Sequence, residues 1–144
     1  MALENPRNAT SRQRDKDPDS RLGLTFPLSM GSKGYFKTSS TLLEQTKSNL
    51  KNLLLTVKGE RIAQPEFGSG IYNVLFENFD SDFTERMRSE INNSIEQWLP
   101  HVIVKGLVID AQPDNNLVSI ELSFGLVQDA NATESITLNL QRDI

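Results

Sequence analysis

The stretch that decides the fold reads Arg61-Ile-Ala-Gln-Pro-Glu-Phe-Gly-Ser-Gly-Ile-Tyr-Asn-Val-Leu-Phe-Glu-Asn-Phe79. It joins two turn signals, Pro65-Glu66 and Gly68-Ser69-Gly70, to a short apolar run. Glycine adopts backbone conformations that are closed to residues with a β-carbon, so we expect the chain to turn sharply there. The apolar groups around the turn must be covered by a core; they are Phe67, Ile71, Leu75 and Phe76. We therefore predict a turn followed by a short helix near residues 69–77.

Upstream of this stretch, the apolar pattern predicts an amphipathic helix from about residue 40 to residue 56. Ser40 or Thr41 is expected to cap its start, because Glu44 follows near capping-box spacing. Lys58-Gly59 is expected to end the helix with a basic turn and a glycine. The residues of the apolar face are Leu43, Thr46, Leu50, Leu53, Leu54 and Val57.

Downstream, large apolar side chains repeat at helical spacing and predict a second long helix that ends at about Trp98. Asp80 or Ser81 is the expected cap, and Pro100 prevents the helix from continuing. The repeating positions are Phe83, Met87, Ile91, Ile95 and Trp98.

The last third of the chain changes to a period of two, which predicts strands. The strands are expected near residues 102–109, 118–126 and 136–140, separated by a turn at Pro113–Asn116 and a polar loop at 129–133. Short connections indicate an antiparallel meander with one face covered by helices. The predicted fold class is therefore α+β, with two long helices and a short helix packed on a small antiparallel sheet of about three C-terminal strands.

The first residues differ from this body and predict an extended N-terminal arm over residues 1–37, followed by one domain over residues 38–144. Residues 1–20 are polar and charged, so they are expected to be disordered or to order only on a partner. Residues 21–37 mix apolar groups with glycine and proline, as an extended segment with a short strand would.

Composition limits the classes of protein to consider. The 144 residues suffice for one domain, and 37% hydrophobic residues with a mean hydropathy of −0.41 predict a modest core. The longest apolar cluster, residues 102–109, is broken by Lys105 and Gly106, so no membrane span is predicted. The N-terminus lacks the layout of a secretion signal. The absence of cysteine excludes disulfides and thiolate metal sites and is compatible with a reducing cytoplasm.

The charge distribution argues against binding to nucleic acid. Residues 1–21 hold five basic and four acidic residues, whereas the rest of the chain holds ten basic and fifteen acidic residues. Nonspecific binding to nucleic acid needs a sustained basic surface, which an acidic body does not provide.

Catalytic chemistry finds little support in the residues. A glycosidase needs two carboxylates held in a cleft, and the candidates Glu60, Glu66, Glu77 and Asp80 carry no sign of such a setting. His101 is the only histidine, and no nucleophile elbow, metal-ligand spacing or phosphate loop accompanies it. We therefore predict no catalytic residue, no metal site and no cofactor.

The stretch nevertheless resembles a known family. Gly59-Glu-Arg61, then Pro65-Glu-Phe-Gly-Ser-Gly70, then Leu75-Phe-Glu-Asn78 and an acidic helix start are similar in order and spacing to the baseplate wedge proteins that start the sheath of contractile phage tails. Relatives occur in type VI secretion baseplates, and some have been labelled lysozyme-like. The resemblance covers roughly residues 40–141 and implies the same kind of α+β fold. It assigns a structural role to Gly59, Arg61, Pro65, Phe67, Gly68, Gly70, Leu75 and Phe76.

The resemblance implies two sites for partners. The family carries Glu-Pro-Arg between its last long helix and its sheet, where it docks on the helical core of the wedge; here the aligned residues are Leu99, Pro100 and His101, and only the proline is retained. The alternative is a proline that merely stops the helix. The final strand, with Ile136, Leu138 and Leu140, is expected at a sheet edge where sheath subunits add a strand. The alternative is a strand paired on both sides.

The function implied is that of a non-enzymatic baseplate component, present in multiple copies, that docks on the wedge core and nucleates sheath polymerisation. The partners implied are the tail sheath protein and other wedge proteins, with the tail tube or hub as a further candidate, but neither nucleic acid nor membrane. Its place would be the tail baseplate of the virion, after assembly in the host cytoplasm. The alternatives are a peptidoglycan hydrolase of the tail and the equivalent adaptor of a type VI or related contractile injection system.

Overall fold

The computed structural model describes residues 21–31 and 35–141. The expectation for residues 1–20 lies outside the described residues. The chain divides into two compact units, Met1–Asn49 and Leu50–Ile144, and each is described by itself. This division falls inside the first long helix, so the predicted boundary at residues 37/38 stays a prediction.

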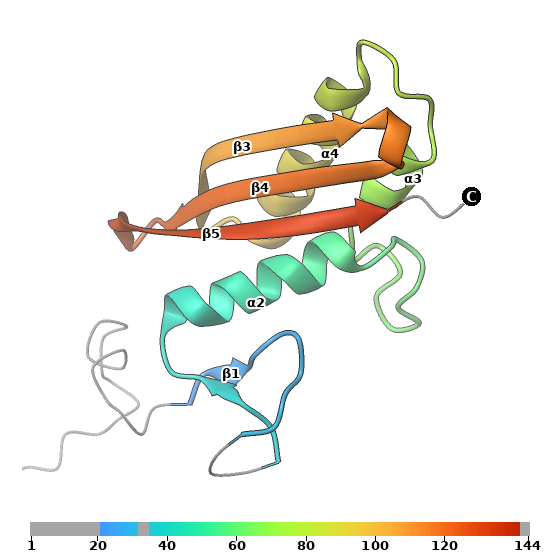
Figure 1. Cartoon of the computed structure of the whole chain (residues 1–144). Helices are drawn as coiled ribbons and strands as arrows, with labels where there is room; N and C mark the ends of the chain where they lie inside the picture. Colours follow the sequence, from blue (N-terminus) through green and yellow to red (C-terminus); the bar gives the residue numbers. More distant parts are fainter. Residues whose placement is uncertain (1–20, 32–34, 142–144) are drawn as a thin grey trace, which may run out of the picture. The chain divides into compact units, whose positions relative to one another are not determined.

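The first unit contains a small antiparallel hairpin. Strand β1 (Gly23–Leu24) pairs with β2 (Thr38–Ser39), with Gly23 opposite Ser39 (Figure 1). The Thr25 amide donates a hydrogen bond to the Lys37 carbonyl at 3.1 Å, which extends the pairing. The segment that the sequence predicted as extended thus folds back on itself.

Helix α2 (Leu42–Leu55) confirms the first predicted helix. The Glu44 amide donates to Thr41 Oγ1 at 3.2 Å, and the Ser40 amide donates to the Glu44 carboxylate at 3.3 Å, so the predicted cap forms at Thr41. The helix ends at Leu55, before the predicted stop at Lys58-Gly59. This end lies within one residue of the predicted position near residue 56, but Gly59 is not the stop, because it turns the following loop at a φ of 96°.

The second unit contains the two other helices. Helix α3 (Ile71–Leu75) confirms the short helix, and α4 (Phe83–Trp98) ends at the predicted residue. The cap of α4 was predicted wrongly. Asp82, not Asp80 or Ser81, occupies the N-cap position, and the Asp80 carboxylate accepts a hydrogen bond from the Asp82 amide at 3.2 Å.

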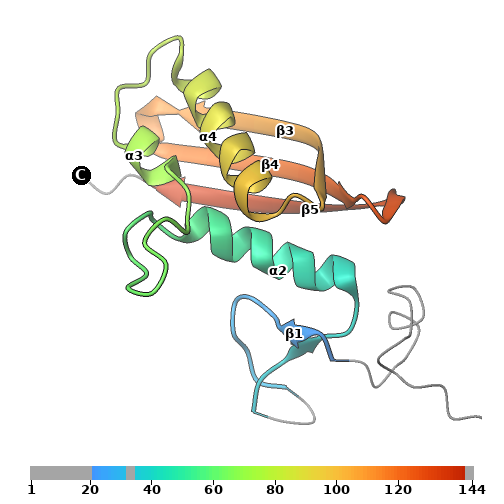
Figure 2. The same cartoon turned by 180° about the vertical axis from the view of Figure 1, so that it is seen from behind.

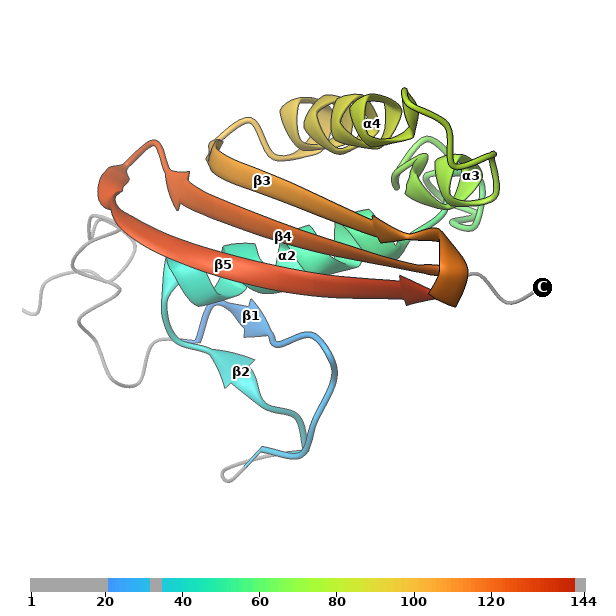
Figure 3. The ribbon, with the colours of Figure 1, turned by 45° about the horizontal axis from the view of Figure 1, so that its top comes forward.

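The sheet of the second unit consists of β3 (Val102–Gln112), β4 (Leu117–Leu126) and β5 (Asp129–Gln141), in the order β3-β4-β5. All neighbours are antiparallel, which confirms the predicted meander (Figure 3). The turn at Pro113–Asn115 is a 3-10 helix, and the residue after it, Asn116, is left-handed.

The polar loop predicted at residues 129–133 is instead part of β5. The pairing nonetheless shifts there, because Leu126 faces Asp129 whereas Phe124 faces Glu134. Residues 130–133 therefore bulge opposite Gly125 alone. This bulge breaks the alternation from which a strand would have been recognised.

The core lies against one face of the sheet, where α4 crosses it (Figure 2). Alternating residues of β4 point into this core, and the five apolar positions predicted for α4 are buried except for the half-buried Trp98. The opposite face carries mainly polar side chains. The described residues contain three α-helices, a three-stranded sheet and a two-stranded hairpin, and this α+β architecture confirms the predicted fold class. The fully buried β4 residues are Val118, Ile120, Leu122 and Phe124.

Candidate interaction sites

The signature stretch closes the C-terminal end of α2. The Ser69 amide donates to the Thr56 carbonyl at 2.9 Å, and the Ser69 hydroxyl donates to the Leu54 carbonyl at 2.8 Å. The last carbonyls of a helix have no partner within the helix, so these bonds satisfy groups that would otherwise be buried unpaired. Ser69 is completely buried, which explains a polar residue at this place.

Two signature glycines are required by this closure. Gly59 has a φ of 96° and donates its amide to the Pro65 carbonyl at 2.8 Å. Gly68 has a φ of 130°, and a β-carbon there would lie 2.5 Å from the Thr56 carbonyl oxygen. A residue with a side chain would suffer both backbone strain and a clash at Gly68.

Aromatic contacts join the signature loop to the end of α4. The Arg61 guanidinium lies 3.8 Å from the centre of the Phe67 ring. Phe67 in turn meets Trp98 edge-on, with ring centres 5.2 Å apart. These contacts tie Arg61 and Phe67 of the loop to Trp98 of α4. Phe76, which was expected to be covered by the core, is 55% exposed instead.

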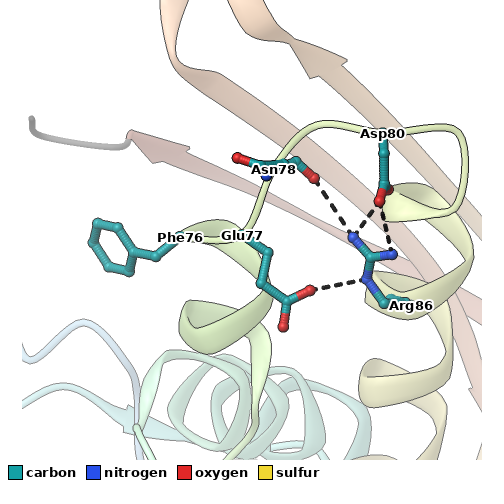
Figure 4. A pocket seen from close by; sticks show the side chains of 5 residues that line it. All are labelled: Phe76, Glu77, Asn78, Asp80 and Arg86. Atoms are coloured by element: carbon teal, nitrogen blue, oxygen red, sulfur yellow. Dashed lines mark hydrogen bonds and ion pairs between the residues drawn. The ribbon is translucent and has the colours of Figure 1, made fainter.

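A cluster of charges lies between α3 and α4 around Arg86 (Figure 4). Arg86 Nε lies 2.9 Å from the Glu77 carboxylate, and its terminal nitrogens lie 3.0 and 3.3 Å from the two oxygens of Asp80. Together with Phe76 and Asn78, these residues line a surface cavity of about 440 Å³. The ion pairs of Arg86 were not predicted from the sequence. The usable signal was the position of Glu77 and Asp80 shortly before a helix whose first turns carry Arg86.

The electrostatics of this cluster oppose acid catalysis. The hydrogen bonds from Arg86 lower the pKa of the Asp80 carboxyl, and Asp80 raises the pKa of Arg86. A general acid of a glycosidase needs a raised pKa instead. Of the other two candidates, Glu60 accepts a hydrogen bond from the Val57 amide at 3.2 Å, and both Glu60 and Glu66 are exposed. Residues 21–31 and 35–141 contain no group of acids and His101 that could hold a metal ion.

The junction between α4 and β3 is a tight turn at one end of the sheet. The Leu99 amide donates to the Ile95 carbonyl at 2.8 Å, and the Val102 amide donates to the Leu99 carbonyl at 2.9 Å. Pro100 and His101 are exposed, and the His101 carbonyl accepts a hydrogen bond from the Val127 amide at 3.0 Å. The predicted wedge-core site thus lies beside the β4–β5 hairpin turn.

Strand β5 forms one edge of the sheet. Within the described part of the chain it pairs with β4 and with no other strand. The side chains of Ile136, Leu138 and Leu140 are buried, with at most 6% exposed, so they cannot contact a partner directly. Only the backbone on the open flank of β5 is available for a further strand, and its use stays a prediction.

The hairpin of the first unit exposes large apolar side chains. Met30 and Tyr35 are 84% and 86% exposed, and five neighbours are exposed as well. The sequence pattern predicted an arm here and gave no sign of an apolar surface. The exposed residues are Leu22, Leu24, Phe26, Leu28, Met30, Tyr35 and Phe36.

The described residues thus hold an α+β body, an edge strand that pairs on one side and a hairpin with exposed apolar side chains. Among the described residues, no helix has the length and apolar character needed to cross a membrane. The sequence model of the family described as "Baseplate wedge protein gp25" matches residues 40–131 of the chain. The chain belongs to this family, and it is a structural protein of the baseplate wedge in contractile tail systems.

Individual proteins are similar to this chain in sequence or in fold. The "Baseplate wedge protein gp25" of Enterobacteria phage T4 is 24% identical over 98 residues, which cover 68% of this chain and 74% of that protein. A crystal structure provisionally described as a tail lysozyme from Geobacter sulfurreducens shares the fold, with a TM-score of 0.66, 16% identity and coverage of 75% of this chain and 97% of the other. A chain of the anti-feeding prophage baseplate has a TM-score of 0.55 and 20% identity, and the match covers 84% of this chain and 85% of that one.

Proposed function

We propose that this baseplate protein nucleates sheath polymerisation by accepting a strand from the tail sheath protein along β5. The single observation that carries the proposal is that the open edge of β5 is regular and lacks the usual protection against strand pairing. Proteins usually protect an exposed edge with charges, prolines or short strands. Residues 135–141 of β5 contain neither a charge nor a proline, and they form a continuous ladder with β4.

Docking on the wedge core is assigned to the junction at Leu99, Pro100 and His101. The family's charged pair is absent, so the contact here would rest on the half-buried Leu99 and on the exposed His101 ring. Val127 is 61% exposed and lies beside the junction through its bond to the His101 carbonyl, which enlarges the apolar part of this end. This end would face the other wedge proteins while β5 extends away from it.

The hairpin of the first unit would pack on a neighbouring wedge protein, with the tail tube or hub as the further candidate. Residues 20–43 contain Arg21, Lys33 and Lys37 and no acid, in addition to the exposed apolar side chains. Contiguous exposed apolar groups on a small protein mark a surface that a partner covers.

The protein acts without catalysis in this proposal. Its carboxylates near the signature are ion-paired or exposed, and the pKa of Asp80 is lowered rather than raised. Zymography of the purified protein on peptidoglycan should show no clearing, and clearing that is lost on Glu60, Glu66 or Glu77 substitution would reverse this conclusion. Gene neighbourhood separates a virion baseplate assembled in the host cytoplasm from the adaptor of a type VI or related injection machine.

The test of strand addition must leave the fold intact. Deleting Glu134–Ile144 should leave baseplates without sheaths, but it also removes three core side chains. The double substitution Thr137→Lys with Asn139→Lys is sharper, because both side chains are exposed and lysine on an edge opposes strand pairing. The matched control is Asp110→Lys on the exposed face of β3. Electron microscopy of particles should show unsheathed baseplates for the double variant and sheathed ones for the control; normal sheaths on the double variant would reject strand addition at β5.

A further inference from the structure

Lys105 makes an unusual set of contacts across the exposed face of the sheet. Its ammonium group donates to the Ala130 carbonyl at 2.6 Å, to Thr133 Oγ1 at 2.5 Å and to the Ala132 carbonyl at 3.4 Å. An ammonium group has three donors, so each has an acceptor here. All three acceptors belong to the bulge of β5, which lies two strands away from β3.

Two irregularities of the sheet make this reach possible. The pairing of β3 with β4 shifts between Val104 and Gly106, so Lys105 is the extra residue of a β-bulge. On β4, Gly125 leaves room for the lysine stem, because a β-carbon there would lie 2.8 Å from Lys105 Cε and 3.0 Å from the Ala132 carbonyl oxygen. The Lys105 side chain therefore starts at the bulge of β3, passes over Gly125 of β4 and ends at the bulge of β5.

The contacts divide β5 into two parts. Glu134–Gln141 pairs residue by residue with Leu117–Phe124. In the bulge, the carbonyls of Ala130 and Ala132 accept hydrogen bonds from Lys105, which reaches them from the side of β4. A strand added to β5 needs regularly spaced backbone groups along the open flank, and residues 130–133 depart from the regular pairing that supplies them.

We propose that Lys105 locks residues 130–133 as a register stop, which confines the incoming strand to the edge Glu134–Gln141. This inference rests on the proposed strand addition and specifies its site. The acceptor edge spans roughly 26 Å at about 3.3 Å per residue, enough for one extended segment of the partner. The partner segment should carry small or uncharged polar side chains on the exposed face, where it would lie beside Ser135, Thr137 and Asn139.

Hydrogen exchange of the isolated protein tests the lock without any partner. Lys105→Met keeps most of the apolar stem and removes the donors. Backbone amides of residues 130–133 should then exchange about tenfold faster, as expected for the loss of hydrogen bonds to a charged group, while residues 135–141 keep their rates. Lys51→Met removes the same charge from α2 and should change neither segment. Unchanged exchange at 130–133 in Lys105→Met would overturn the lock, whatever happens in assembled particles.

Photo-crosslinking in assembled particles tests the stop. The chain has no cysteine, so Asn131→Cys and Asn139→Cys each give a single site for a benzophenone label on an exposed position of β5. With Lys105 intact, cross-links to the sheath protein should form at least about tenfold more from position 139 than from position 131, and Lys105→Met should bring the two yields together. Equal yields with Lys105 present, or an unchanged ratio in Lys105→Met, would overturn the register stop. Cross-links from neither position would instead refute strand addition itself, and the stop with it.

Discussion

The two edge strands of the sheet differ in the features that protect an edge from pairing with a strand of another chain. Strand β3 carries a bulge at Lys105, an exposed acid at Asp110 and a flanking helix, with which it lines a cavity of about 330 Å³. Strand β5 confines its irregularity to residues 130–133 and leaves Glu134–Gln141 regular. Bulges, charges and covering helices are the usual protections of an edge, so β3 is guarded along its length and β5 only at one end.

Under the proposed strand addition, the protective features lie along the edge that is not used, and the edge proposed to accept a strand stays regular. Both edges share β4 and the same core, yet β3 is interrupted by a bulge and β5 is regular from Glu134 to Gln141. The substitutions below test this contrast, beginning with the largest expected effect.

Strand β4 pairs with both edge strands, so a destabilising substitution in β4 should disrupt both edges and remove the difference between them. Leu122 is completely buried, and Leu122→Ala should lower the free energy of unfolding by about 3 kcal/mol through lost burial and a cavity. Urea denaturation followed by circular dichroism measures this. Glu121→Ala, on the exposed face of the same strand, should change stability by less than about 0.5 kcal/mol. Similar losses from both variants would mean that the two faces are not distinct.

Substitutions in the signature loop should lower the stability of the fold without changing the structure of either edge strand. Gly68→Ala should cost about 2 kcal/mol, because φ is 130° and the new β-carbon meets the Thr56 carbonyl. Gly59→Ala has the strained φ of 96° but nothing within 4 Å, so it should cost about 1 kcal/mol. Thermal unfolding gives the ranking, and hydrogen exchange of β3 and β5 should stay in the wild-type order. A reversed ranking of the two variants would contradict the loop geometry.

Removing a protection from β3 should make that edge associate. Asp110→Thr takes away an exposed charge beside the exposed Val108, which leaves a longer uncharged edge. We expect weak, concentration-dependent self-association in sedimentation experiments, within roughly 1 kcal/mol of the wild-type stability. Asp114→Thr, outside the strand, is the control. Monomeric behaviour of Asp110→Thr at all concentrations would show that other features guard β3.

The smallest effect concerns pH and should not distinguish the edges at all. Arg86 lowers the pKa of Asp80 below its ordinary value of 3.8, so the ion pair stabilises the folded chain above that pH. The contribution is lost as the pH falls through the lowered pKa, and Asp80→Asn should remove this part of the acid dependence. Denaturation at pH 6 and at pH 3 measures it, with Asp82→Asn as the matched control. An equal acid dependence in wild type and Asp80→Asn would refute the assigned ion pair.

The sequence by itself determined the family, the helices and strands, and most of the residues at which these helices and strands begin and end. The periods of 3.6 and 2 are local properties, so α2, α4 and the alternating part of β4 could be read from residues such as Leu50, Met87 and Ile120. The signature predicted the turn at Gly68 and the short helix that follows it. A positive φ strongly favours glycine, so such a turn can be recognised from the residue type. The role of Gly59 in the loop after α2 and the N-cap position at Asp82 were missed, because several nearby residues could serve equally.

Only the tertiary structure decided which flank of the sheet stays open, and how its open part is bounded. The bulge at residues 130–133 depends on the pairing of Phe124 with Glu134. The reach of Lys105 depends on Gly125 of β4, the strand between Lys105 and the groups that it binds. The pairing of Arg86 with Glu77 and Asp80 likewise requires the turn between α3 and α4. Such relations join residues distant in the chain through strand order and register, which no local pattern encodes.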